Sequence, residues 1–209
     1  MGLTWVTVLG WVAAAVAAFL GLPQVVRIAR TRDTAGVALF TWQTMLGLGL
    51  GWLSHGIQIG SAQQIAANSV GAIWTMTVLI LLIRSRGTNP LRVFVPSLLI
   101  AGTLVLADAF FGTTVFGLVM IAPTILANIA QTIALIRAPQ VGGVSPVFLL
   151  ASITTQALWT TWGVVVGDAG TVVGSASGAL IVLFNLVWWV LRRRGLRPLF
   201  VTAAPSDSE

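Results

Sequence analysis

Seven apolar segments run along the chain and are separated by short turns that are richer in polar residues. They cover roughly residues 4–28, 37–59, 65–84, 92–109, 113–136, 145–166 and 170–191. Each can form a helix across a hydrocarbon core of ~30 Å, although the fourth is only just long enough. The continuous apolar runs lack the alternation that a transmembrane barrel needs. The pattern therefore predicts an all-α membrane protein with seven transmembrane helices.

The composition agrees with a membrane protein and argues against an enzyme. Of the 209 residues, 57% are hydrophobic and only 8% are charged, whereas a soluble domain carries about 25% charged residues. The absence of cysteine excludes disulfides and thiolate metal sites. With one histidine, no carboxylate pair within a span and no phosphate loop, the sequence predicts no catalytic set, no metal site and no cofactor.

The charged residues predict the orientation in the membrane. All eleven basic residues are arginines, and with seven spans all of them fall on one side. Asp108 and Asp168 fall on the other side. Because arginine and lysine accumulate on the cytoplasmic side, the N-terminus is expected outside and the C-terminus in the cytoplasm. The net charge of +6 then reflects membrane orientation and not a nucleic-acid partner, and residues 195–209 are expected to form a disordered cytoplasmic tail.

An internal repeat relates the two ends of the chain. Residues 22–72 pair without a gap with residues 129–179, at an offset that stays constant through three predicted helices. The identical pairs include Gln24 with Gln131, Arg30 with Arg137, Gly36 with Gly143, Val37 with Val144, Trp52 with Trp159 and Gly71 with Gly178. The repeat predicts a first three-helix unit (1–88), a linker helix (89–111) and a second three-helix unit (112–194). A single linker helix keeps both units the same way up, so the repeats are parallel.

Taken together, these features resemble the SWEET and PQ-loop family of membrane transporters. The Pro23-Gln24 pair matches the motif near the cytoplasmic end of the first helix, and the likeness covers about residues 5–192. The resemblance implies a 3+1+3 arrangement with the substrate midway across the membrane, between the two bundles.

The resemblance also implies substrate-binding residues. Sugar-transporting members use a Trp on the second helix and an Asn on the third, sixteen positions later. Trp52 and Asn68 have this spacing, and the second unit has Trp159 and Ser175. Ser175 departs from the family pattern, which puts in doubt that the two halves contact a sugar symmetrically. Each residue also has a structural interpretation, because Trp is common at membrane interfaces and Asn ties transmembrane helices together.

Gating residues are implied in the same way. The family uses prolines near the cytoplasmic ends of helices 1, 2, 5 and 6, and Pro23 and Pro146 match two of these positions. Leu39 and Ala130 occupy the other two, so gating is expected to hinge mainly on helices 1 and 6. Gln24 and Gln131 are expected to brace helix ends at the inner gate.

Two further polar residues are candidates to line the pathway. His55 titrates near neutrality and could handle protons, but it is better interpreted as a neutral, hydrogen-bonded residue near the outer mouth. Asn128 is expected either to line the inner half of the path or to tie helices together.

The sequence therefore favours a transporter that moves a small neutral solute, with a mono- or disaccharide preferred, by gradient-driven alternating access. With no buried acid in view, facilitated movement is expected. A PQ-loop exporter of amino acids or related solutes remains an alternative, and a non-transporting receptor of the same fold is a weaker one. The expected partners are a small-molecule substrate and the lipid bilayer, and a homo-oligomer is left open.

Overall fold

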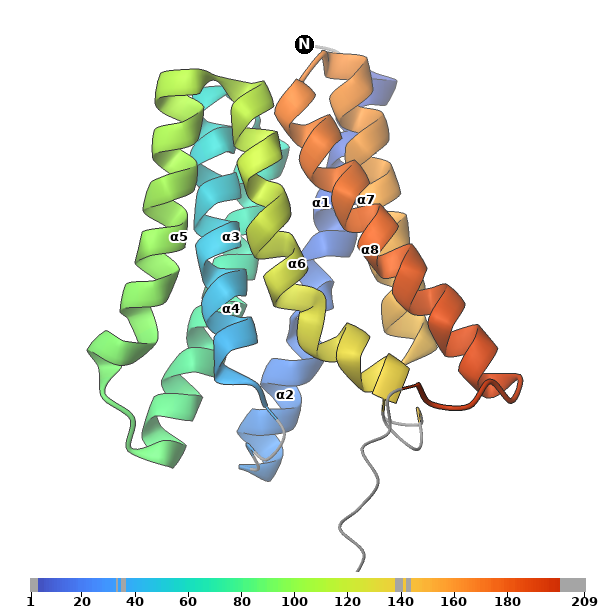
Figure 1. Ribbon diagram of the computed structural model, residues 1–209. Coiled ribbons are helices and arrows are strands. Elements are labelled where there is room, and N and C mark those ends of the chain that lie inside the picture. The colour runs from blue at the N-terminus through green and yellow to red at the C-terminus, as the bar shows by residue number, and fades with distance from the viewer. Residues whose placement is uncertain (1–3, 33, 35–36, 138–140, 142–143, 200–209) are drawn as a thin grey trace, which may run out of the picture.

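Short turns join long helices into a single bundle (Figure 1). The computed structural model describes residues 4–32, 34, 37–137, 141 and 144–199. Within these residues it has eight helices: α1 (Trp5–Leu20), α2 (Leu22–Thr31), α3 (Leu39–Gln58), α4 (Ala62–Arg86), α5 (Pro90–Phe111), α6 (Thr113–Arg137), α7 (Pro146–Val166) and α8 (Ala169–Arg193). The described residues contain no strand, so the all-α prediction is confirmed. Most of the predicted tail, from residue 200 onward, lies outside the described residues, as do Gly36 and Gly143 of the repeat.

The first predicted span is broken near its C-terminal end. Gly21 separates α1 from α2, and Pro23 is the second residue of α2. Proline has no N–H to donate to the carbonyl four residues earlier, which here belongs to Phe19, and its ring crowds that carbonyl. Gly21 itself stays in the right-handed helical region. The two helices therefore continue as one element, residues 5–31, with an interruption at the proline.

Six segments are long and apolar enough to cross a membrane: Trp5–Thr31, α4, α5, α6, α7 and α8. The remaining helix, α3, has 20 residues, enough for about 30 Å, but it is more polar. Its buried residues include Gln43, Thr44 and His55. Because α3 packs against α4, α5 and α6, neighbouring helices and not lipid surround these polar side chains.

The helix bounds follow the repeat found in the sequence. The starts of α3 and α4, residues 39 and 62, correspond to the starts of α7 and α8, residues 146 and 169. The ends of α4 and α8, residues 86 and 193, correspond in the same way. The constant offset holds although the two halves have different residues at most positions. Helix α5 has no counterpart in the repeat.

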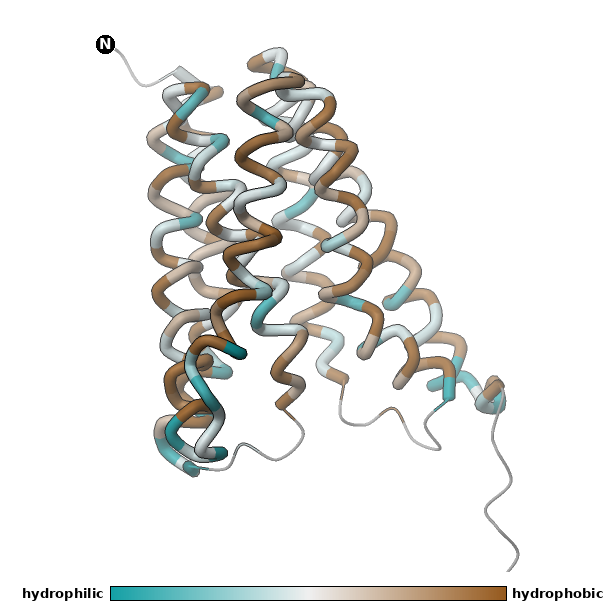
Figure 2. The backbone as a smooth tube through the Cα atoms, turned by 60° about the vertical axis from the view of Figure 1, so that its left-hand side comes forward, coloured by the Kyte–Doolittle hydropathy of each residue, from teal (hydrophilic) through white to brown (hydrophobic). Residues whose placement is uncertain are grey.

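Packing joins the helices into two groups. In one group α3 packs against α4, and α4 also contacts α1 and α2; in the other, α8 packs between α6 and α7. Helix α5 lies against α3 and α6 and so connects the groups on one side, while α1 contacts α7. The hydropathy colouring shows apolar residues over the length of the bundle and polar residues gathered at the lower helix ends (Figure 2).

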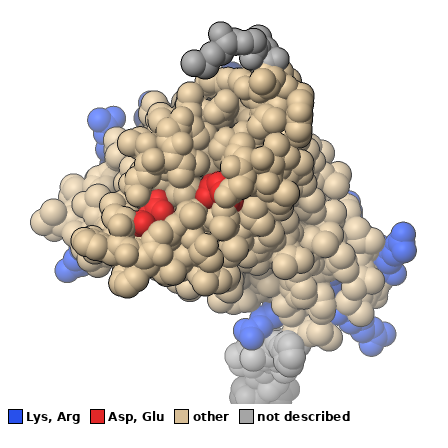
Figure 3. All heavy atoms as spheres, turned by 90° about the horizontal axis from the view of Figure 1, so that it is seen from above, with Lys and Arg blue, Asp and Glu red and all other residues tan. Residues whose placement is uncertain are grey.

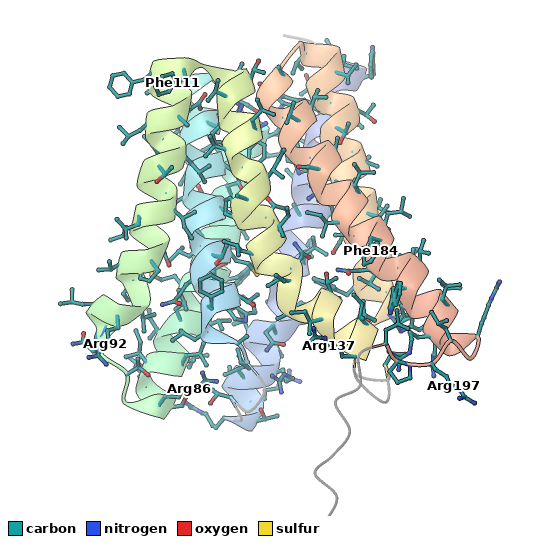
Figure 4. All side chains as sticks on the ribbon, in the orientation of Figure 1. Arg86, Arg92, Phe111, Arg137, Phe184 and Arg197 are labelled. Atoms are coloured by element: carbon teal, nitrogen blue, oxygen red, sulfur yellow. The ribbon has the colours of Figure 1, made fainter. Side chains whose placement is uncertain are left out.

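The two ends of the bundle differ in charge. Arg86, Arg92, Arg137 and Arg197 lie at its lower end, opposite Phe111 (Figure 4); we call this the arginine end. Arg86 also ties the end of α4 to the segment between α2 and α3 there, since its guanidinium donates to the carbonyl oxygens of Thr34 and Val37. Viewed from above, the acidic atoms of the described residues are red and central, and the blue atoms lie at the rim (Figure 3). We call this the aspartate end.

Candidate functional site

Trp52 and Trp159 lie where the two halves of the chain meet, and each packs against the opposite half. Trp52 of α3 contacts Phe116 of α6 edge to face, with 5.0 Å between ring centroids. Its indole also covers Gly174 of α8, where an added Cβ atom would lie 2.6 Å from Cζ2. A glycine at this position therefore lets the tryptophan approach the α8 backbone closely.

Trp159 makes the corresponding contacts in the other direction. It belongs to α7 and to a buried cluster with Trp162 of the same helix, Ala13 and Ala14 of α1 and Ala67 of α4. Ala67 and Gly174 are equivalent in the repeat. The structure thus places each tryptophan against the helix of the other half that carries its predicted polar residue, Asn68 on α4 or Ser175 on α8.

The two predicted polar residues have different surroundings. Asn68 is half-buried, and its Nδ2 donates to the carbonyl oxygen of Gln64 one turn earlier, at 2.9 Å. Ser175 is 4% exposed. The hydrogen bond from Asn68 to the backbone of its own helix uses one of the two N–H donors of its side-chain amide.

A hydrogen bond between equivalent residues marks the axis that relates the two halves. Gln64 Nε2 of α4 donates to Thr171 Oγ1 of α8 at 2.6 Å, and the two residues are 107 positions apart. Both side chains are buried. Two equivalent positions can meet in this way only close to a pseudo-two-fold axis, so α4 and α8 face each other across it.

Gln156 is a polar residue that sequence reasoning missed. It lies against α8, where a Cβ atom added to Gly178 would come 2.1 Å from its Nε2. Gly178 is one turn from Ser175. In the first half the equivalent positions are Gly49 and Gly71, and a Cβ added to either would meet no atom within 4 Å. The second half therefore carries an amide where the first half has open space.

The predicted gating prolines occupy different positions in their helices. Pro23 lies at the break between α1 and α2, whereas Pro146 is the first residue of α7, where proline removes no intrahelical hydrogen bond. Helix α6 has Pro123 in its interior and bends in its lower half (Figure 1). Matching at a fixed offset missed Pro123 because it pairs Pro23 with Ala130.

The remaining candidates lie toward the arginine end. Gln24 on α2 and Gln131 on α6 are half-buried, as is Asn128. Thr132 Oγ1 donates to the backbone of Asn128 and to Oδ1 of Asn185 on α8, at 3.2 and 2.8 Å. Asn185 is fully buried. This bond ties α6 to α8, and sequence reasoning did not single out Asn185.

His55 lies between two carboxylates at the aspartate end. Its Nδ1 is 2.7 Å from Oδ2 of Asp108 at the end of α5, and its Nε2 is 2.9 Å from Oδ2 of Asp168 between α7 and α8. The ring is fully buried and stacks on Phe116, with 4.4 Å between centroids. We call His55, Asp108 and Asp168 the outer cluster.

Further donors surround both carboxylates. Gln58 Nε2 donates to Asp108 at 3.0 Å. Asp168 caps α8 and accepts hydrogen bonds from the hydroxyls of Thr113 and Thr171 and from backbone N–H groups of α8. Burial raises the pKa of Asp168, but the hydrogen bonds from His55, Thr113 and Thr171 lower it more, so the pKa lies well below its usual range. Asp168 is therefore a carboxylate.

The outer cluster corrects one expectation from the sequence. His55 was expected to be a hydrogen-bonded residue near the outer mouth, and it does make hydrogen bonds, but no buried acid was expected. Asp108 and Asp168 are each only 7% exposed, and they bracket the ring. Nothing in the local sequence indicates this, because the two aspartates are 53 and 113 residues from His55. They come together because α3 and α5 pack against each other and against α6, and α6 packs against α8.

A hollow of about 380 Å³ opens beside this cluster at the aspartate end. Its lining includes Ser61, Gln63, Thr113, Trp162 and Asp168. These residues come from the α3–α4 and α7–α8 turns, the starts of α4 and α6 and the last turns of α7. The hollow therefore lies at the junction of the two halves, and Asp168 belongs both to its lining and to the outer cluster.

Comparisons with known proteins point to one class. No family model matches the chain. The sugar transporter SWEET1 of Danio rerio is 26% identical over 183 residues, which cover 81% of this chain and 83% of that protein. The solved structure of a eukaryotic SWEET transporter matches with a TM-score of 0.69 and 16% identity, over 92% of this chain and all of the other.

The fold is thus that of a multi-pass α-helical membrane protein, and it matches the fold of the solved SWEET transporter over nearly the whole chain. The match to a SWEET transporter sequence supports the resemblance to the SWEET family that the repeat and the Pro-Gln motif indicated, and the structural match shows the same fold. Both matched proteins are named as transporters, which agrees with the expectation that this protein is not an enzyme.

Proposed function

We propose that this protein moves a small neutral sugar, a mono- or disaccharide, down its gradient by alternating access. The observation that carries the proposal is the crosswise packing of Trp52 and Trp159 at the interface of two equivalent halves. An indole face suits the apolar C–H face of a sugar ring. The similarity to a SWEET sugar transporter over four fifths of both chains supports the same substrate class.

The architecture behind this proposal is a 3+1+3 arrangement with seven spans, in which α3 is the seventh. The matching bounds of α3 and α4 with α7 and α8 support it, as does the Gln64–Thr171 hydrogen bond on the axis. Parallel repeats of this kind place the substrate near the midplane, between the halves. Trp52, Asn68, Trp159 and Ser175 would form that pocket, and Gln156 would add an amide on the side where Ser175 replaces an asparagine.

The arginine end would face the cytoplasm and the aspartate end the outside, by the positive-inside rule. The described hydrogen bonds that join the two halves, His55–Asp168 and Gln64–Thr171, lie toward the aspartate end. The described polar contacts toward the arginine end stay within a half or reach α5, as in Gln43 to the carbonyl of Arg92. This distribution supports a conformation that is closed to the outside. Pro23, Pro123 and Pro146 would serve as hinges on the inner side.

A second candidate is a proton-coupled exporter of amino acids, and the outer cluster is the observation that favours it. A buried histidine with two carboxylates is a proton-handling group, which a gradient-driven sugar carrier does not need. The two candidates differ in substrate chemistry, since an amino acid carries two charges that the uncharged pocket proposed here does not neutralise.

Binding to the purified protein tests the proposal. The shift in thermal unfolding temperature would be measured with a panel of mono- and disaccharides and, in parallel, with neutral amino acids. Stabilisation by at least one sugar, lost in Trp52→Ala and Trp159→Ala, is the expected result. Stabilisation by amino acids alone would instead support the exporter.

A further inference from the structure

The number of hydrogens in the outer cluster follows from its geometry. Both ring nitrogens of His55 lie within hydrogen-bonding distance of a carboxylate oxygen, at 2.7 and 2.9 Å. A neutral imidazole has one N–H, and a carboxylate has none. One of the two contacts would then join a nitrogen lone pair to an oxygen lone pair. The arrangement therefore needs one proton more than a neutral histidine and two carboxylates supply.

The surroundings of the carboxylates favour the ring as the place for that proton. Asp168 already accepts from Thr113, from Thr171 and from backbone N–H groups, so its oxygens are occupied as acceptors. Asp108 accepts from Gln58 as well as facing the ring. An imidazolium donates from both nitrogens, and charge-assisted hydrogen bonds of this kind are about twice as strong as neutral ones.

No other charged group among the described residues balances the cluster. Helices α4, α5 and α6 pack against α3. Helix α5 contributes Asp108, α6 contributes the uncharged Phe116 and Thr113, and the charged residues of α4, Arg84 and Arg86, lie at its opposite end. The α7–α8 turn contributes Asp168. The proton on His55 thus leaves the cluster with a net charge of −1 instead of −2.

The cluster connects all three parts of the chain. His55 lies on α3 in the first half, Asp108 on the linker helix α5 and Asp168 in the second half. On the basis of the alternating access proposed above, we propose that the outer cluster is a proton-binding site whose occupancy holds the outer side of the transporter closed. Opening the outer side would move Asp168 away from His55 and remove one of the two acceptors of the imidazolium.

The direction of the pH effect follows by linkage. The closed form binds the proton with two carboxylates, and the open form with one, so protons favour the closed form. The ratio of open to closed molecules therefore rises with the outside pH, by at most about tenfold per pH unit for one proton. The proton enters and leaves on the outer side, so it regulates transport and does not drive it.

Distance measurements between spin labels test this proposal without any substrate, so its outcome is independent of the sugar assignment. The chain has no cysteine, which allows a single labelled pair at Ile59 and Val166. Both side chains are about 40% exposed, they lie in opposite halves, and they border the hollow at the aspartate end. Distance distributions would be recorded in lipid nanodiscs at about pH 5.5 and about pH 8.5, on either side of the usual histidine range.

The longer distance should gain population at the higher pH in the parent protein. In Asp108→Asn the amide can donate to Nδ1 of a neutral ring while Nε2–H faces Asp168, so no extra proton is needed and the populations should not change with pH. His55→Gln should be equally insensitive. A parent protein whose distances do not respond to pH would overturn the proposal. So would an Asp108→Asn variant that keeps the full pH response.

Discussion

Replacing Gly174 with alanine tests the contact between the two halves on which the substrate site depends. The added Cβ would lie 2.6 Å from Cζ2 and 2.8 Å from Cη2 of Trp52, so the indole ring must move by about 1 Å to regain a normal contact distance. Overpacking of this kind costs typically ~1–3 kcal/mol. If the displaced ring forms one face of the sugar pocket, affinity should fall by about 5- to 150-fold.

Gly71→Ala is the matched control, because its added Cβ would meet no atom within 4 Å. Both substitutions introduce the same residue inside a helix, where alanine is favoured over glycine by ~1 kcal/mol. The assay is equilibrium sugar binding to purified, monodisperse protein, with thermal unfolding recorded on the same samples. The reasoning is refuted if Gly174→Ala binds sugar and unfolds as Gly71→Ala does.

The remaining predictions concern orientation, the polar half of the pocket and coupling. The chain has no cysteine, so single cysteines can be labelled selectively. Phe111→Cys, where the side chain is 72% exposed, should react with an impermeant reagent outside the cell, and Thr88→Cys should not. The reverse pattern excludes the orientation with the N-terminus outside. Asn68→Ala should weaken sugar binding by about 5- to 150-fold through an unpaired hydrogen-bonding group, and Ser175→Ala should do less because water can replace a hydroxyl; equal affinities in the parent and both variants would remove these residues from the pocket. His55→Gln should retain sugar uptake, and an imposed pH gradient should drive no accumulation in either protein; gradient-driven accumulation that the variant loses would show coupling.

Much of the fold could be predicted because the bilayer permits few solutions. Long apolar runs must be helices, arginines at one end fix which helix ends lie together, and a constant offset identifies equivalent helices. The break at Pro23 was harder to predict, since it changes the helix without interrupting the apolar run. The polarity of α3 was understated, because Gln43 and His55 are tolerated only through contacts with α4, α5 and α6.

The candidate site could be predicted only in part. Trp52 and Trp159 could be singled out because they recur at the repeat offset, and the structure places both where the two halves of the chain meet; their role in binding stays a prediction. The outer cluster has no such signal. Asp108 lies near the end of α5 and Asp168 just before α8, and an aspartate within a turn of a helix end is usually solvated. Gln156 was missed for a related reason. Its equivalent in the first half is a glycine, so a comparison of identical residues in the two halves does not find it.

Uptake of radiolabelled sugars into proteoliposomes that contain only this protein tests the central claim most directly. A panel of mono- and disaccharides would be compared with neutral amino acids, without any ion gradient, and with Trp159→Ala as the inactive reference. The account predicts saturable equilibration of at least one sugar, which the variant loses while remaining folded. Equilibration of no sugar, with uptake of amino acids that requires a pH gradient, would contradict it.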